Sequence, residues 1–249
     1  MRTTARTANA RPAFRRRRRR KGLVIAIDGP AGVGKSTVGR LVARTMGYHF
    51  INTGEMFRAL AWKALADGVD VDDQAAVTAL ALRLRWEFRP SADGTLKTFI
   101  DSQAAAERIR DERVSAASSA VAANPGVRRF MCLLQRRLGA GGSIVMEGRD
   151  IGTHVFPDAD HKIYLDAAVD ERARRRYRQL KFSGVRVRLQ AVREAMLKRD
   201  LNDLKRKINP LSLAPDAVVV DSTRLTLREV AGKIVGLIRA GLRRGNGSR

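Results

Sequence analysis

The residues with the clearest chemical meaning run from Gly29 to Ser36, Gly-Pro-Ala-Gly-Val-Gly-Lys-Ser. They match G-x-x-x-x-G-K-[ST], a loop whose backbone N–H groups point at phosphate oxygens. Its glycines allow a tight turn near an anion, Lys35 adds a charge for the outer phosphates, and the Ser36 hydroxyl suits Mg²⁺. The loop therefore predicts a site for a nucleoside triphosphate with magnesium. The residues expected to hold the triphosphate are Gly29, Pro30, Ala31, Gly32, Val33, Gly34, Lys35, Ser36 and Thr37, and Ser36 is the expected metal ligand.

The elements on either side of this loop are those that the motif requires. An apolar run from Leu23 to Asp28 predicts a buried strand, and apolar residues in 37–46 recur at helical spacing. A helix that begins at the loop places the positive end of its dipole against the phosphates. The phosphate-loop motif thus lies between a predicted strand and a predicted helix, as such loops require.

A second set of charged residues follows another predicted strand. Residues 143–147 form a buried-strand pattern that runs directly into Glu147, Arg149 and Asp150. Ligands of a parallel sheet gather at the carboxyl ends of its strands. A carboxylate here can hold a magnesium-bound water or recognise part of a second substrate. The residue types alone do not distinguish these two roles.

Other candidate anion ligands lie on predicted helices. Thr53, near the cap of its helix, and Arg58 could receive a second anion, although an ordinary helix cap and a surface arginine fit equally well. The basic residues of 171–179 and 187–205 would ordinarily be solvated faces. Beside a phosphate loop they become candidates for neutralising a transferring phosphoryl group.

The order of predicted elements indicates an α/β fold: a three-layer P-loop sandwich with a five-stranded parallel sheet and helices on both faces. The strands after the first are expected at 48–51, 143–147, 161–166 and, as a buried strand, 217–221. The helices after the first are expected at 52–65, 72–84, 111–123, 127–138, 171–179, 187–205 and 225–242, and a hairpin at 86–89 and 95–100.

The net charge of +24 is unevenly distributed along the 249 residues. Residues 1–21 hold ten of the 49 basic residues and no acidic one, which leaves 39 bases against 25 acids in the remainder. We expect this arm to be disordered and either solvated or weakly bound to polyanions without sequence preference. An arginine-rich segment without acids also resembles an organellar transit peptide.

Composition excludes several other classes of protein. Cys132 is the single cysteine, so an intrachain disulfide and a cysteine-based metal site are excluded, as suits a reducing compartment. The chain has no apolar run long enough to span a membrane. We expect a cytoplasmic monomer that does not bind membranes.

Four motifs occur together and in the same order in bacterial cytidylate kinases, and residues 22–240 resemble that family. They are Gly29–Ser36, Thr53–Arg58, Glu147–Asp158, and Arg199–Arg206 followed by Pro210-Leu211. The resemblance implies that ATP phosphorylates CMP or dCMP to CDP or dCDP with Mg²⁺.

The resemblance also implies a division of the chain. A nucleoside monophosphate kinase domain would span 22–242, between the arm at 1–21 and a basic tail at 243–249. Within it, a CMP-binding insertion would cover about 53–138 and a helical lid about 170–210.

Roles for individual side chains are implied by the same resemblance. Ser119, Arg128 and Asp150 would read the cytosine; Arg199 and Asp203 would hold the sugar; and Thr53, Arg58, Arg149 and Arg206 would bind the CMP phosphate. The catalytic set would be Lys35, Arg149, Arg206 and Arg175, the last from a lid cluster at 172–176.

One position departs from the family pattern. The family usually has tyrosine where this chain has Phe57, and the hydroxyl would be expected to help bind the acceptor phosphate. We expect a modest loss of CMP affinity and no loss of activity.

Two alternatives stay open at this point. A related small-molecule kinase, such as an adenylate or shikimate kinase relative, would keep the loop but replace Arg128, Asp150 and Asp203. A P-loop NTPase that acts with nucleic acid would explain the basic charge, but aromatic residues are only 5% of the chain and form no stacking motif.

Overall fold

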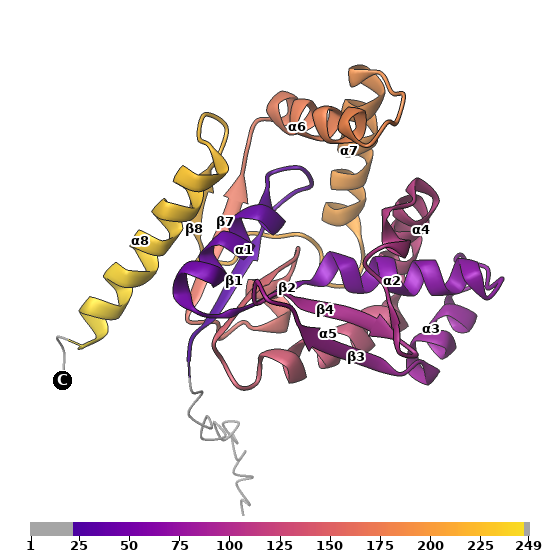
Figure 1. Ribbon diagram of the computed structural model, residues 1–249, viewed down its shortest axis with the longest axis horizontal. Coiled ribbons are helices and arrows are strands. Elements are labelled where there is room, and N and C mark those ends of the chain that lie inside the picture. Colours follow the sequence, from indigo (N-terminus) through magenta and orange to yellow (C-terminus); the bar gives the residue numbers. More distant parts are fainter. Residues whose placement is uncertain (1–21, 247–249) are drawn as a thin grey trace, which may run out of the picture.

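The computed structural model describes residues 22–246 (Figure 1). The arm predicted at 1–21 lies outside the described residues, as do residues 247–249 of the basic tail. The predictions made for the arm therefore stay predictions.

The centre of the fold is a parallel sheet with the strand order β2-β6-β1-β7-β8. All five residues of β1 are buried, and this strand lies in the middle of the sheet and leads into the phosphate loop. The predicted five-stranded parallel sheet is confirmed. The strands are β1 (Val24–Asp28), β2 (His49–Asn52), β6 (Ile144–Glu147), β7 (His161–Asp166) and β8 (Val218–Asp221).

The last strand is not the buried strand that its apolar run predicts. β8 pairs only with β7 at the edge of the sheet, and Val218 and Val219 are 45% and 52% exposed. Val220 alone in this run faces the core, with no exposed surface. An apolar run indicates a strand but does not tell whether a neighbour covers both of its sides.

Alternate residues of β1 pack into two separate cores, one on each face of the sheet. Ile25 and Ile27 belong to the core formed with α1 (Lys35–Met46) and α8 (Leu227–Asn246). Val24 and Ala26 belong to the core formed with α2 (Thr53–Ala66), α4 (Glu112–Ala123) and α5 (Pro125–Gly139). Strand residues alternate in direction, so one sheet organises the predicted three layers.

The chain between β2 and β6 forms a continuous group of elements, part of which covers one face of the sheet (Figure 1). The predicted hairpin is confirmed: β3 (Trp86–Pro90) and β4 (Leu96–Ile100) pair antiparallel. The remaining elements of this region are α2, α3 (Gln74–Arg83), β5 (Gln103–Ala104), a 3₁₀ turn (Arg108–Arg110), α4 and α5.

Two helix starts differ from prediction for a local reason. The cap of α2 is Asn52, whose side chain accepts from the N–H of Glu55, rather than Thr53. α5 begins at Pro125, because Asn124 caps it and proline needs no hydrogen-bond acceptor in a first turn.

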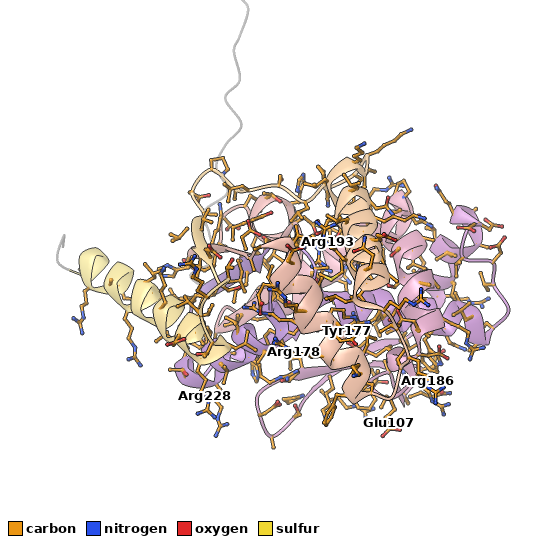
Figure 2. All side chains as sticks on the ribbon, turned by 90° about the horizontal axis from the view of Figure 1, so that it is seen from above. Glu107, Tyr177, Arg178, Arg186, Arg193 and Arg228 are labelled. Carbon is orange, nitrogen blue, oxygen red and sulfur yellow. The ribbon has the colours of Figure 1, made fainter. Side chains whose placement is uncertain are left out.

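Two helices lie beyond the carboxyl ends of the sheet strands, above the phosphate loop (Figure 1). They are α6 (Val169–Phe182) and α7 (Leu189–Lys205), with a break at Gly184, where φ is 78°. Figure 2 looks down on them, with Tyr177 and Arg178 labelled on α6 and Arg193 on α7. Ala173, Val192 and Met196 form a small core between the two helices. α7 begins two residues later than predicted.

Candidate functional site

The phosphate loop requires glycine where it passes closest to its neighbours. At Gly29 φ is 146°, and a Cβ there would lie 2.0 Å from the carbonyl oxygen of Leu165. At Gly32 φ is 78°, and a Cβ would lie 2.6 Å from the side chain of Met196 on α7. The loop is therefore held closely between β7 and the helices above it.

Lys35, the first residue of α1, is buried among backbone carbonyls. Its Nζ donates to the oxygens of Gly29 at 2.7 Å and Pro30 at 2.6 Å. Burial and, after it, the charge of Arg149 lower the pKa of Lys35 to about 7, against the opposing effect of Glu147. A triphosphate would supply the negative charge that favours the ammonium form.

Ser36 meets two polar side chains from neighbouring strands. Its Oγ donates to Glu147 Oε1 at 2.5 Å, and Asn52 Nδ2 donates to the same Oγ at 3.3 Å. Thr53 Oγ1 donates to the carbonyl oxygen of Glu147 at 2.7 Å. Glu147 is at the carboxyl end of β6, paired in register with Ile27 of β1, so the sheet itself brings it to the loop.

A hydroxyl and a carboxylate together are oxygen ligands of the kind that Mg²⁺ prefers. Among residues 22–246 no group of three or more His, Cys, Asp and Glu could hold a metal ion. The donor set at Ser36 and Glu147 therefore fits a magnesium ion that is shared with bound phosphates, rather than a cage made by the protein alone.

Two of the three residues predicted to read the base, Arg128 and Asp150, form a buried ion pair. Arg128 on α5 donates from Nη2 to Asp150 Oδ2 at 2.8 Å and from Nη1 to the oxygen of Ala122 at 3.0 Å. Arg206, after α7, approaches the other Asp150 oxygen at 3.6 Å. The guanidinium of Arg128 also lies over the ring of Phe57, 5.5 Å from its centroid.

The same group contains donors without acceptors. Among the described residues, Arg128 Nε and Arg206 Nη2 are buried and have no hydrogen-bond partner. A buried donor left unpaired is costly, and such groups are normally satisfied by protein, water or ligand.

Asp203 joins this group to Arg149. Arg149 Nε donates to Asp203 Oδ2 at 2.8 Å, and Arg206 Nη1 donates to Asp203 Oδ1 at 3.2 Å. Burial raises the pKa of Asp203, but Arg149 and Arg206 outweigh it and keep that pKa below its usual value. Burial and, after it, the charge of Arg128 lower the pKa of Arg206 to about 10.

A small cavity of about 40 Å³ lies between α4 and α7, and four predicted residues line it: Ser119, Arg199, Asp203 and Arg206. Arg199 is half-buried there, and burial and then the charge of Arg149 lower its pKa to about 10. The structure thus brings together side chains that are separated by up to 87 positions in the sequence, from Ser119 to Arg206.

Two predicted arginines lie apart from this cavity. Arg175 donates to the oxygen and Oγ of Ser222 at 2.7 and 3.1 Å and to the oxygen of Val33 at 3.4 Å, so it ties α6 to the end of β8. Arg58 on α2 is half-buried, and burial lowers its pKa against the effect of Glu55 and Glu147. The catalytic role of Arg175 stays a prediction.

Sequence reasoning missed Asp28, which connects the phosphate loop to the second group. Its two carboxylate oxygens accept from the N–H groups of Ile151 at 2.9 Å and Gly152 at 2.7 Å. These residues begin a π-helical turn, Ile151–Val155, directly after Asp150. Burial raises the pKa of Asp28 to about 6, against the effect of the two N–H donors. The available signal was an acidic residue at the end of an apolar strand.

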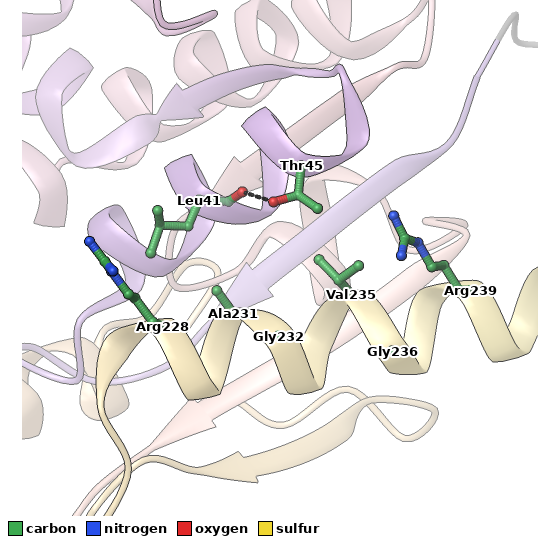
Figure 3. Close-up of a pocket in the computed structure, with 8 residues that line it drawn as sticks. All are labelled: Leu41, Thr45, Arg228, Ala231, Gly232, Val235, Gly236 and Arg239. Carbon is green, nitrogen blue, oxygen red and sulfur yellow. Dashed lines mark hydrogen bonds between the residues drawn. The ribbon is translucent and has the colours of Figure 1, made fainter.

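A larger cavity of about 530 Å³ lies elsewhere, on the outer side of α1 against α8 (Figure 3). It is lined by Leu41, Thr45, Arg228, Ala231, Gly232, Val235, Gly236 and Arg239. None of these is a residue predicted to bind a nucleotide. No helix within 22–246 is long and apolar enough to cross a membrane.

Comparisons with known proteins give one consistent family. Residues 25–240 match the family described as Cytidylate kinase. The cytidylate kinase of Bacillus licheniformis is 44% identical over 218 residues, 88% of this chain and 96% of that protein. The cytidylate kinase of Geobacillus thermodenitrificans is 45% identical over 216 residues, 87% of this chain and 96% of that protein.

Similarity to solved structures is weaker. A shikimate kinase from Acinetobacter baumannii, in complex with shikimate, is 17% identical with a TM-score of 0.44, and the match covers 88% of this chain and 94% of that chain. A likeness at that score carries no weight, and the fold assignment rests on the parallel sheet and the loop after β1.

Proposed function

The chain belongs to the cytidylate kinase family, and on that premise we propose that it transfers the γ-phosphoryl group of ATP to CMP and dCMP, giving ADP and CDP or dCDP. The enzyme is a phosphotransferase whose acceptor is a phosphate group. The proposal assigns the donor to the loop Gly29–Ser36 and the acceptor to the group around Asp150 and Asp203.

The observation that carries the acceptor assignment is the pair of unsatisfied buried donors, Arg128 Nε and Arg206 Nη2. We assign Arg128 to donate to ring acceptors of cytosine, and the Asp150 carboxylate to accept from the exocyclic amine. Cytosine carries an amine donor where uracil carries a carbonyl, so this pair would favour CMP over UMP.

The charges of the acceptor group also support a phosphate ligand. The cations Arg128, Arg149, Arg199 and Arg206 surround the carboxylates Asp150 and Asp203, which leaves an excess of positive charge. The phosphate of CMP carries about −1.5 to −2 charges at pH 7. Thr53 and Arg58 on α2 are assigned to the same phosphate, with Arg149 and Arg206, and Arg199 with Asp203 to the sugar.

No general base is required for this chemistry. The attacking oxygen of the CMP phosphate is already largely ionised at pH 7, since its second pKa is about 6. The residues act by positioning the two phosphates in line and neutralising their charge. Lys35 would bind the outer phosphates of ATP, and Arg149 and Arg206 would hold the acceptor oxygen toward them.

Magnesium would be held by Ser36, with Glu147 beside it, together with the ATP phosphates. When bound, it would neutralise negative charge that develops on the phosphate oxygens during transfer.

We also propose that the segment 170–210, with Arg175, acts as a closing lid, and that 53–138 is a CMP-binding insertion. Closure would exclude water and so protect ATP from hydrolysis.

The proposal also covers the basic arm, the oligomeric state and the location of the protein. We propose a cytoplasmic monomer with small-molecule substrates, in which residues 1–21 contact nucleic acid at most without specificity. Deletion of 2–21 should leave kcat unchanged, and a large fall in kcat would contradict this part of the proposal.

One assay tests the function directly. Production of ADP is followed by a coupled assay with CMP, dCMP, UMP and AMP as acceptors, and CMP and dCMP should give the highest kcat/KM. Higher activity with UMP or AMP would refute the assignment of Arg128 and Asp150 to cytosine. ATP turnover that depends on added RNA or DNA would favour the nucleic-acid alternative.

A further inference from the structure

A buried ion pair outside the proposed substrate contacts clasps the phosphate loop from above. Arg172 on α6 and Asp200 on α7 are 5% and 7% exposed, and Arg172 Nη1 donates to Asp200 Oδ2. Arg172 is anchored at its own end of α6, where Nε donates to the oxygen of Ala167 at 3.0 Å. We refer to Arg172 and Asp200 as the clasp.

The clasp engages both backbone groups of one loop residue. Asp200 Oδ1 accepts from the N–H of Ala31 at 3.1 Å, and Arg172 Nη1 donates to the oxygen of Ala31 at 3.1 Å. The next residue, Gly32, has no room for a Cβ, which would lie 2.6 Å from Met196 and 3.2 Å from the oxygen of Arg172. Charge, hydrogen bonds and close packing therefore hold α6 and α7 against the loop in this structure.

The same helix reaches the acceptor group. Arg199 and Asp203 flank Asp200 on α7, and both line the small cavity against α4. Residues three apart on a helix are neighbours on its surface, so Asp200 and Asp203 move as one body. Asp200 contacts the donor loop, while Asp203 pairs with Arg149 at 2.8 Å.

We propose that the clasp couples the two halves of the site, so that binding at the donor loop raises the affinity of the acceptor group and the reverse. Arg172 and Asp200 are positioning residues, because their polar contacts are with each other and with the backbone. A displacement of Ala31 moves Asp200, and through α7 it moves Arg199 and Asp203. The inference rests on the proposed function, since it names the ligands that are coupled.

The test measures a coupling factor rather than activity alone. The dissociation constant of CMP is determined by calorimetry with and without Mg²⁺ and the β,γ-imido analogue of ATP, in the unchanged chain and in Asp200→Asn. The ATP analogue should tighten CMP binding by about 5- to 150-fold in the unchanged chain. In Asp200→Asn this factor should fall toward one, while the affinity for CMP alone changes little.

A matched control is available between the same two helices. Arg193 on α7 pairs with Asp170 on α6 at 2.9 Å, but their side chains are 41% and 64% exposed and lie away from the loop contacts. The variant Arg193→Ala with Asp170→Ala should keep the coupling factor. Equal loss of coupling in this control would overturn the inference, because α6–α7 stability in general would then explain the effect.

A second variant covers the case in which Asp200→Asn does not fold. Arg172→Lys keeps the charge beside Asp200 but removes the planar guanidinium that contacts Ala31 and Ala167 together. It should lower the coupling factor in the same direction, and melting curves establish that each variant is folded.

The outcomes separate this inference from the proposed function. No binding of CMP to the unchanged chain would contradict the proposed function itself. Binding of both ligands without coupling in the unchanged chain, or with the same coupling factor in a folded clasp variant, would overturn the clasp alone.

Discussion

The two halves of the proposed site are built in different ways. The donor half is eight consecutive residues, Gly29 to Ser36, whose backbone and one lysine face the ligand. The acceptor half is a network of side chains from α4, α5, α7 and the turn after β6, with Arg128–Asp150 and Arg149–Asp203 as its ion pairs. Backbone recognition tolerates any triphosphate, whereas side-chain recognition selects one base.

The two halves also differ in how their buried charges affect the stability of the folded state. Lys35 is buried and donates to two neutral carbonyl oxygens, and burial outweighs the attraction of Glu147, so its charge is a cost to the folded state. The acceptor cations are instead paired with carboxylates, and removal of one partner leaves the other as a buried charge without a counter-ion. Substitutions in the two halves should therefore have opposite effects on stability.

Lys35→Met gives the largest expected effect on the reaction. Loss of the cation at the transferring phosphoryl group should lower kcat by about 100- to 1,000-fold. Stability should not fall, because burial already lowers the pKa of Lys35 to about 7 and methionine removes the buried charge. Steady-state kinetics and thermal melting at pH 7 check both. A clear loss of melting temperature would contradict the stated cost of the buried lysine.

Asp150→Asn should damage both recognition and stability. It leaves Arg128 without its carboxylate and Arg206 with Asp203 alone, and removal of one partner of a buried pair costs up to about 3–5 kcal/mol. We expect a lower melting temperature and a kcat/KM for CMP reduced by about 100-fold. The asparagine amide can donate to the uracil carbonyl, so the ratio of CMP to UMP activity should fall. An unchanged ratio would show that Asp150 does not read the base.

The lysine also predicts a proton linked to donor binding. Because the pKa of Lys35 in the free protein is about 7, the group is mostly neutral at pH 8, and bound phosphates favour its charged form. Binding of MgATP should therefore take up protons at pH 8 and few at pH 6. Calorimetry in two buffers of different ionisation enthalpy measures the uptake. Release of protons at pH 8 would contradict the assignment.

Phe57→Tyr is the smallest expected change. Phe57 lies under the guanidinium of Arg128, and the added hydroxyl would restore the group usual in the family. The KM for CMP should fall slightly with kcat unchanged. A large rise in KM would show that this position is used in another way.

The same contrast decides what the sequence could predict. The donor loop is contiguous and its context is local, so Gly29–Ser36 and the strand and helix beside it follow from residue types alone. The acceptor residues are far apart in the chain. From spacing alone, Thr53 and Arg58 could form an anion site or be an ordinary helix cap and a surface arginine. Only the family resemblance gave Ser119, Arg128 and Asp203 a role.

Other features could not be predicted because they depend on what packs beside them. The apolar run of β8 predicts a buried strand, but β8 lies at the edge of the sheet and no strand pairs with its outer side. Asp28 lies just before the phosphate loop and Asp200 lies within the motif Arg199–Arg206, but nothing in the sequence assigned a role to either side chain. Their roles depend on the backbone groups that they bind, which are those of Ile151, Gly152 and Ala31. Asn52 rather than Thr53 caps α2, because the Thr53 hydroxyl is bound to Glu147.

The central claim is that the donor loop and the acceptor group face each other across one transferred phosphoryl group. Titration with adenosine and cytidine joined through their 5′ oxygens by five phosphates tests it most directly. We expect one molecule bound per chain, with a Kd at least about 100-fold below that of CMP. Binding no tighter than CMP, or two molecules per chain, would contradict it.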